Sequence, residues 1–146
     1  ALERLGVQIL PNQSLEIERD GERLTIIGIE DPLMGKEPQQ MLDEAMATVD
    51  DKSFKILLSH RPEIFETYVE NAVDVVFTGH AHGGQIRLPF SDGLFAPGQG
   101  WFPSQTSGVH EADETRMVVS RGLGNSVLQQ RLFNLPEIVV VDLKSQ

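Results

Sequence analysis

Three of the four histidines in the chain stand just beyond two stretches that are predicted to be β-strands. His60 follows the apolar run 54–58, and His80 and His82 follow the apolar run 73–77. In extended backbone, residues two apart point to the same side and lie about 6.5 Å from each other. Two imidazoles so placed can bind one metal ion or serve two neighbouring ions. Because nitrogen ligands without thiolates suit Zn, Mn, Fe, Co or Ni, this spacing predicts a transition-metal site.

Glycines surround the second pair of histidines, in the segment 79–84, which reads GHAHGG. These glycines disfavour a helix, permit tight turns and leave space for a ligand. In open α/β sheets, ligands bind in the crevice beyond the carboxyl ends of the strands, which is where all three histidines fall. The fourth histidine, His110, has no second chemical feature beside it and is interpreted as a surface residue.

The apolar pattern switches between the period of a strand and that of a helix, which predicts an α/β fold with a mixed sheet. Asp20-Gly21 predicts the turn of a hairpin. Residues 89–108 hold four glycines and three prolines and are predicted to form a long loop, either a lid or a packed loop without a ligand. The expected strands are 7–10, 15–19, 23–29, 54–58, 73–77, 115–120 and 137–143, and the expected helices are 38–49 and 63–69.

The composition narrows the possible classes of function. The 146 residues include 22 acidic and 12 basic side chains, a formal net charge of −10, so no nucleic-acid-binding surface is expected. The absence of cysteine excludes disulfides, zinc–thiolate sites and a cysteine nucleophile in this chain. No apolar run approaches the roughly 18 residues that would suggest a membrane span.

Two segments together resemble the last two metal motifs of the calcineurin-like metallophosphoesterases. They are 56–63, ILLSHRPE, and 76–89, VFTGHAHGGQIRLP. Residues 119–124, VSRGLG, and 136–138, PEI, are similar to one bacterial branch of single-domain, often membrane-associated phosphohydrolases. The resemblance covers essentially the whole chain. It implies an α/β fold that is part of a four-layer α/β/β/α sandwich with mixed sheets.

The resemblance also implies a chemistry. Enzymes of this family hydrolyse phosphomonoesters or phosphodiesters at a dinuclear centre of divalent transition-metal ions (Mn, Fe, Zn, Co or Ni), so a phosphate-ester substrate is expected. By resemblance, His60 and His80 bind one ion and His82 binds the other. Arg121 and Asn125 stand at a glycine-rich junction and are candidates for contact with the substrate phosphate, with a purely structural turn as the alternative.

The first three metal motifs of the family, Asp-X-His, Gly-Asp and Gly-Asn-His, have no counterpart in the chain. Residues 1–146 are therefore expected to be the C-terminal portion of a metallophosphoesterase domain, with the missing N-terminal half as its partner. The bridging carboxylate and the catalytic histidine would lie in that half. No catalytic residue is expected in this chain, which alone would bind at most one ion and be inactive.

Three acidic residues of the chain are candidates for further ligands, namely Asp31, Glu63 and Asp74. Asp31 is the most interesting of the three because it follows a strand, but the family pattern assigns it no ligand role. Asp31-Pro32 is interpreted as a turn, and Glu63 as a charge in the first turn of a helix, where it complements the helix dipole.

Further expectations concern partners and location. Sheet surface uncovered by the missing half favours association, so a dimer through that surface is expected. The expected location is the cytoplasm or the periphery of a membrane. A different class of function also fits the residues: a non-catalytic metal-binding or structural module in which three histidines hold one zinc ion. The reading frame upstream of Ala1 would discriminate between the two.

Overall fold

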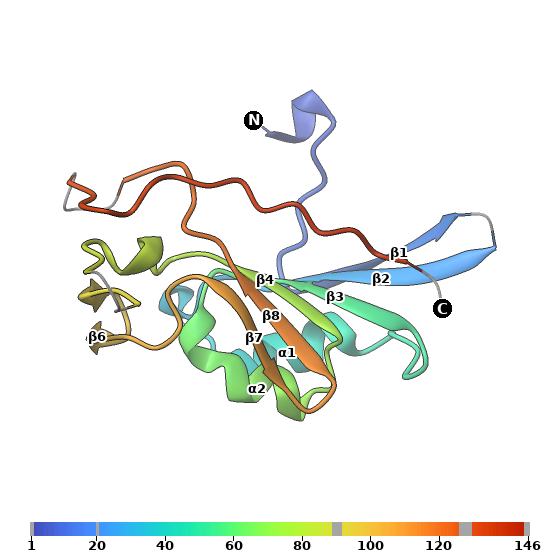
Figure 1. Cartoon of the computed structure of the whole chain (residues 1–146). Coiled ribbons are helices and arrows are strands. Elements are labelled where there is room, and N and C mark those ends of the chain that lie inside the picture. Colours follow the sequence, from blue (N-terminus) through green and yellow to red (C-terminus); the bar gives the residue numbers. More distant parts are fainter. Residues whose placement is uncertain (1, 20, 89–91, 126–129, 145–146) are drawn as a thin grey trace.

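A six-stranded mixed sheet forms the centre of the molecule, which we describe from a computed structural model (Figure 1). The structure describes residues 2–19, 21–88, 92–125 and 130–144. The order of the strands across the sheet is β1-β2-β3-β4-β8-β7. Their bounds are Gln13–Arg19 for β1, Glu22–Gly28 for β2, Phe54–Leu58 for β3, Val75–Thr78 for β4, Gly108–Ala112 for β7 and Thr115–Val119 for β8.

The inner part of the sheet is parallel and its two edges are antiparallel. Strands β2, β3, β4 and β8 run parallel to one another, whereas β1 pairs with β2 and β7 pairs with β8 in the antiparallel sense. The inner strands β3 and β4 are short and mostly apolar, as is usual where parallel strands are covered on at least one face. The α/β class and the mixed sheet predicted from the sequence are confirmed.

Two helices cover one face of the sheet (Figure 1). Helix α1 spans Pro38–Met46 and buries Met41, Leu42 and Ala45, which share one face of the helix. Helix α2 spans Phe65–Glu70 and buries Phe65 and Tyr68. These side chains pack with Ile27, Leu57, Val76, Met117 and Val119 from the strands to make the core.

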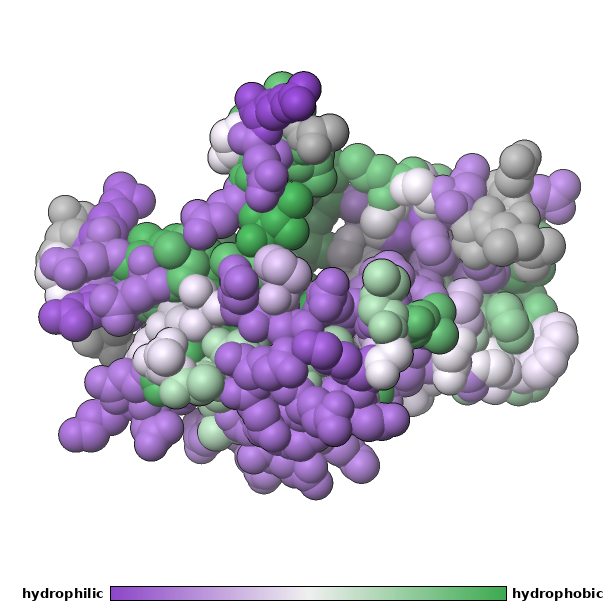
Figure 2. All heavy atoms as spheres, turned by 180° about the vertical axis from the view of Figure 1, so that it is seen from behind, coloured by the Kyte–Doolittle hydropathy of each residue, from purple (hydrophilic) through white to green (hydrophobic). Residues whose placement is uncertain are grey.

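The other face of the sheet carries exposed apolar side chains. Ile17, Phe54 and Leu58 are 39%, 40% and 45% exposed. The C-terminal segment 130–144 runs in extended form along this side, and the N-terminal segment also lies on it (Figure 1). Figure 2 shows apolar atoms gathered around the N-terminal segment, whereas the helical side below is mainly polar. No helix within the described ranges is long and apolar enough to cross a membrane.

Several predicted elements differ from the structure. Residues 7–10 and 137–143 are not strands, because an extended segment becomes a strand only when a neighbouring strand takes its hydrogen bonds, and the described part of the chain offers them none. The expected helix 63–69 begins as a 3-10 turn at Pro62–Ile64 and continues as α2. His110 lies in edge strand β7 and is partly buried.

The predicted hairpin 15–29 is present as β1 and β2, although Asp20 of its turn lies outside the described residues. Within the expected loop 89–108, residues 89–91 also lie outside them. The remainder of that loop contains a two-stranded hairpin, β5 at Phe95–Ala96 and β6 at Gly100–Trp101. The loop is therefore partly ordered by its own backbone pairing.

Candidate metal centre

His60 and His80 meet at the carboxyl edge of the sheet. Strands β3 and β4 are parallel neighbours, with Leu58 paired to Phe77, so the residues that follow them emerge side by side. The distance between Nδ1 of His80 and Nε2 of His60 is 3.0 Å. Their ring centroids lie 4.6 Å apart in an edge-to-face arrangement. The structure thus brings two of the three predicted ligands into direct contact.

The spacing of these two nitrogens fits a shared metal ion. Two imidazole nitrogens bound at about 2.1 Å to one ion are separated by roughly 3.0 to 3.4 Å, depending on the coordination angle. The observed 3.0 Å lies in this range. As the chain stands, the Arg61 guanidinium can only donate to Nε2 of His80, so Nδ1 of a neutral His80 ring carries the proton and donates to His60. Binding an ion between the two rings requires this proton to leave Nδ1 and Arg61 to leave Nε2, and the nitrogen donors then suit Zn, Mn, Fe, Co or Ni.

The backbone around His60 is hydrogen-bonded to a side chain of the core. The Tyr68 hydroxyl donates to the carbonyl oxygen of Arg61 at 2.6 Å and lies 2.7 Å from Oγ of Ser59. These two residues flank His60. Burial raises the pKa of the Tyr68 phenol, so that it remains a hydrogen-bond donor. A fully buried side chain of α2 thus fixes the segment that presents His60.

The segment that carries His82 is not extended, contrary to the expectation from its spacing. Its backbone turns through left-handed conformations, with φ of 58° at His80, 47° at His82 and 60° at Gln85. Residues His82–Gly84 form a single 3-10 turn. Because Gly83 and Gly84 also have positive φ, the chain reverses direction tightly here, and His80 and His82 do not share one side of a strand.

His82 lies apart from the His60–His80 pair. Among the residues that the structure describes, no group of three or more His, Cys, Asp or Glu side chains is placed to hold one metal ion. The arrangement is a close pair of imidazoles with a third imidazole on the adjoining turn.

The environment keeps the imidazoles in the form that binds metals. Burial, followed by the charge of Arg61, lowers the pKa of His80 below its usual 6.5. Burial, followed by the charge of Arg131, lowers the pKa of His82 in the same way. Both rings are therefore neutral at neutral pH, and a neutral imidazole has a free nitrogen lone pair for a metal.

A buried arginine connects the pair to two carboxylates, a feature that the sequence analysis did not single out. The Arg61 guanidinium donates to both carboxylate oxygens of Asp31 at 2.9–3.2 Å and to Glu63 at 3.2 Å. Its Nη1 also lies 3.0 Å from Nε2 of His80. Burial of the Asp31 carboxyl raises its pKa, but the hydrogen bonds from Arg61 and Leu33 outweigh this and hold it below 3.8.

The three acidic residues considered as further ligands each have a hydrogen-bond or ion-pair partner within the chain. Asp31 accepts a hydrogen bond from the backbone N–H of Leu33, which caps the 3-10 turn Pro32–Met34 and agrees with its interpretation as a turn residue. Glu63 pairs with Arg61. Asp74 accepts from the backbone N–H of Lys55 at 2.6 Å.

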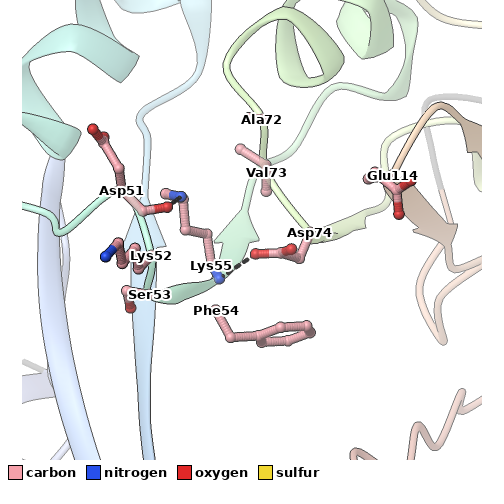
Figure 3. Close-up of a pocket in the computed structure, with 9 residues that line it drawn as sticks. All are labelled: Asp51, Lys52, Ser53, Phe54, Lys55, Ala72, Val73, Asp74 and Glu114. Carbon is pink, nitrogen blue, oxygen red and sulfur yellow. Dashed lines mark hydrogen bonds between the residues drawn. The ribbon is translucent and has the colours of Figure 1, made fainter.

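Asp74 also lines a pocket at the opposite end of the strands from the histidines (Figure 3). The pocket lies between the segments that enter β3 and β4, with Glu114 on the far side. The lining residues are Asp51, Lys52, Ser53, Phe54, Lys55, Ala72, Val73, Asp74 and Glu114. Nζ of Lys55 donates a hydrogen bond to the carbonyl oxygen of Asp51, so the ammonium group of Lys55 already has a partner within the chain.

Arg121 and Asn125 follow β8 in the loop next to His82. The guanidinium of Arg121 pairs with Glu137 at 2.5 Å, and the backbone N–H of Arg121 donates to the same carboxylate at 2.9 Å. The side chain of Asn125 is exposed. Glu137 belongs to the segment PEI that was singled out in the sequence, and its partner became visible only in the structure.

We expect the ion pair between Arg121 and Glu137 to raise the free energy of unfolding, and we expect this contribution to be lost at acidic pH. The hydrogen bond from the Arg121 guanidinium, together with its backbone N–H, holds the pKa of Glu137 below 4.5 despite burial. Stability from the pair is therefore complete above about pH 4.5 and is lost as the pH falls through the lower folded value. Urea titrations at pH 5 and pH 3 should show that Glu137→Gln loses about 1 kcal/mol less than the wild type over this interval.

Glu111→Gln is the matched control for that measurement, because Glu111 pairs with Arg116 at the exposed surface, where ion pairs contribute little. It should lose as much stability between pH 5 and pH 3 as the wild type. An equal loss in Glu137→Gln and the wild type would contradict the expected contribution.

The fold and the site together define an α/β protein with a close pair of imidazoles at the carboxyl edge of its sheet. The chain is 33% identical over 126 residues to the uncharacterized metallophosphoesterase YkuE of Bacillus subtilis, covering 86% of this chain and 42% of YkuE. It is 27% identical to the phosphodiesterase YaeI of Escherichia coli, covering 97% of this chain and 49% of YaeI. It is 29% identical to the UDP-2,3-diacylglucosamine pyrophosphatase LpxG of Chlamydia muridarum, covering 92% of this chain and 40% of LpxG.

These relatives assign the family: the chain belongs to the calcineurin-like metallophosphoesterase superfamily. The chain spans less than half the length of each of these three relatives. No protein-family profile matches the chain. No solved structure matches it either.

Proposed function

We propose that residues 1–146 are the C-terminal portion of a metal-dependent phosphoesterase that hydrolyses phosphomonoesters or phosphodiesters at a dinuclear centre. One arrangement carries the proposal. Nε2 of His60 and Nδ1 of His80 lie 3.0 Å apart at the ends of two parallel strands. His82 lies on the turn that follows His80. The relatives named metallophosphoesterase and phosphodiesterase support a hydrolase.

In this proposal His60 and His80 hold one divalent transition-metal ion and His82 contributes to a second. Such ions act as Lewis acids on a phosphoryl oxygen and lower the pKa of bound water. The chain's own contribution is to present imidazoles at a fixed spacing, with the pKa of His80 lowered by burial. Arg61 contacts Nε2 of His80. Asn125, and Arg121 once it leaves Glu137, are the proposed contacts for the substrate phosphate.

The remaining groups of the centre come from a segment outside this chain. Arg61 engages both Asp31 and Glu63, so neither carboxylate is free to bridge two cations as the chain stands. Two cations a few ångströms apart need such a bridging anion, because neutral imidazoles do not offset their mutual repulsion. We therefore infer that an N-terminal half supplies the bridging carboxylate and the catalytic histidine.

The same half would cover the open face of the sheet. Phe54 and Leu58 are apolar and exposed there, and the extended segment 137–143 runs along that side without a strand partner among the described residues. A second sheet packed on this face would complete a four-layer α/β/β/α sandwich and give segment 137–143 a neighbour. Without that half, the same face would favour a dimer.

The substrate class follows from the relatives. YaeI is named a phosphodiesterase, and LpxG is named a pyrophosphatase of a diacylated nucleotide sugar. Both names describe cleavage at phosphorus, which matches a site built to polarise a phosphoryl group. We extend this to a phosphate-ester substrate for the protein that carries this chain, acting in the cytoplasm or at a membrane surface.

Hydrolysis of bis(p-nitrophenyl) phosphate by the full natural protein tests the proposal. With Mn²⁺ added, release of nitrophenolate should be rapid, and EDTA should abolish it until Mn²⁺ is restored. A protein that binds Mn²⁺ but releases no nitrophenolate from this diester or from p-nitrophenyl phosphate would favour the alternative, a metal-binding module without catalysis. Asp-X-His and Gly-Asn-His motifs in the reading frame upstream of Ala1 would independently favour the enzyme.

A further inference from the structure

A buried asparagine from the C-terminal segment holds the turn that carries His82. Asn134 is 2% exposed. Its Nδ2 donates to the carbonyl oxygen of His82 at 2.7 Å and to the carbonyl oxygen of Gln85 at 3.1 Å. These partners lie 52 and 49 residues earlier in the sequence, so the contact exists only in the folded chain.

The turn needs a partner of this kind, because its backbone is strained. His82 and Gln85 both have positive φ, a backbone conformation that L-residues rarely adopt. Within the turn, the Gly84 N–H donates to Ala81 at 2.8 Å and the Gln85 N–H donates to His82 at a longer 3.3 Å. The amide of Asn134 joins the two ends of the turn, because it bonds to the carbonyl groups of both His82 and Gln85.

The packing around Asn134 is specific to this arrangement. A Cβ atom at position 83 would lie 2.2 Å from Oδ1 of Asn134 and 2.8 Å from Cγ of Arg121. The asparagine therefore reaches the turn only because residue 83 is glycine, which also supplies the positive φ of 64°. Glycine is therefore required at position 83 for two independent reasons, the space that Asn134 occupies and the positive φ.

The segment that carries Asn134 is itself anchored on both sides. Before it, the backbone N–H of Arg87 donates to the carbonyl oxygen of Leu132 at 3.0 Å, and Arg131 donates to the carbonyl oxygen of Arg121 at 2.8 Å. After it, Glu137 pairs with Arg121. Asn134 thus acts from a fixed position rather than from a free tail.

We propose that Asn134 is a positioning residue that sets the direction of the His82 imidazole and thereby the affinity of the metal ion that His82 binds. This inference rests on the proposed function in one respect, namely that His82 is a metal ligand. Outer groups that orient a metal-binding histidine typically affect metal affinity 10- to 100-fold. Asn134 acts through the backbone carbonyl groups of His82 and Gln85 rather than through a ring nitrogen.

The test compares Mn²⁺ binding by three variants of the full natural protein, followed by electron paramagnetic resonance titration. Asn134→Leu keeps the side-chain size and removes both donated hydrogen bonds. Asn71→Leu is the matched control, because Nδ2 of Asn71 also donates to a backbone carbonyl, that of Thr67, and to Gln39, far from the histidines. His82→Ala removes the proposed ligand itself. Thermal unfolding of the metal-free proteins records any loss of stability.

We expect Asn134→Leu to weaken one Mn²⁺ ion about 10- to 100-fold and Asn71→Leu to leave the affinity unchanged. If Asn134→Leu does not fold, Asn134→Ala removes the same two hydrogen bonds without adding bulk. Loss of an ion in His82→Ala with wild-type affinity in the Asn134 variant would overturn the positioning role alone. Wild-type ion binding in His82→Ala would instead overturn the ligand assignment on which it rests.

Discussion

Alanine at His80 should remove a bound metal ion and lower the turnover of the full enzyme by more than 100-fold. Groups that merely orient a ligand already account for 10- to 100-fold in affinity or activity, so loss of the ligand itself should exceed that range. His80 is expected to have the largest effect, because its ring contacts both His60 and Arg61. His60→Ala and His82→Ala should also lower metal content and turnover, by smaller factors.

Metal content by mass spectrometry and hydrolysis of bis(p-nitrophenyl) phosphate would measure the two effects on the same samples. His110→Ala is the matched control, because His110 lies in strand β7, where its Nε2 is 3.2 Å from the carbonyl oxygen of Ser107, away from the paired rings. It should keep both ions and full turnover. A His80→Ala protein with two bound ions and wild-type turnover would refute the ligand assignment.

The purified 146-residue chain should not turn over phosphodiesters above background, even with excess Mn²⁺. Its candidate ligands are all imidazoles, which carry no negative charge, and Arg61 engages the nearby carboxylates Asp31 and Glu63. A half site lacks the second Lewis acid and the placement of the attacking water, and positioning of that kind alone accounts for about 7–11 kcal/mol of a reaction barrier. At most one ion should bind, more weakly than to an intact centre.

The comparison requires the full natural protein, assayed beside the chain at equal concentration with and without EDTA. A further sample, in which the chain is mixed with its proposed N-terminal half, would show whether the two parts restore activity together. Rapid, chelator-sensitive hydrolysis by the chain alone would overturn the proposal. It would mean that a carboxylate within the chain completes the metal centre. The first candidate would be Asp31, which would have to break its ion pair with Arg61.

The arrangement of the inner strands follows from local sequence. Runs such as 54–58 and 73–77 are apolar and end in polar or glycine-rich segments, which is sufficient to predict strands and to place His60 and His80 at their carboxyl ends. Because parallel neighbours present these ends at one edge, the pairing of the two rings is a consequence of strand order. The hairpin of β1 and β2 is equally local, since the sequence of its turn determines its register.

The conformation around His82 depends instead on distant residues. Spacing alone suggested an extended segment, whereas Asn134 and the glycine at position 83 stabilise a left-handed turn. The contact of Arg61 with Asp31 spans 30 residues and carries no sequence signal of its own. Segment 137–143 has the composition of a strand but joins no strand ladder among the described residues, because a strand needs a neighbouring strand as well as a pattern. Periodicity reports which residues prefer burial, but hydrogen bonds between remote segments determine which backbone conformation the site adopts.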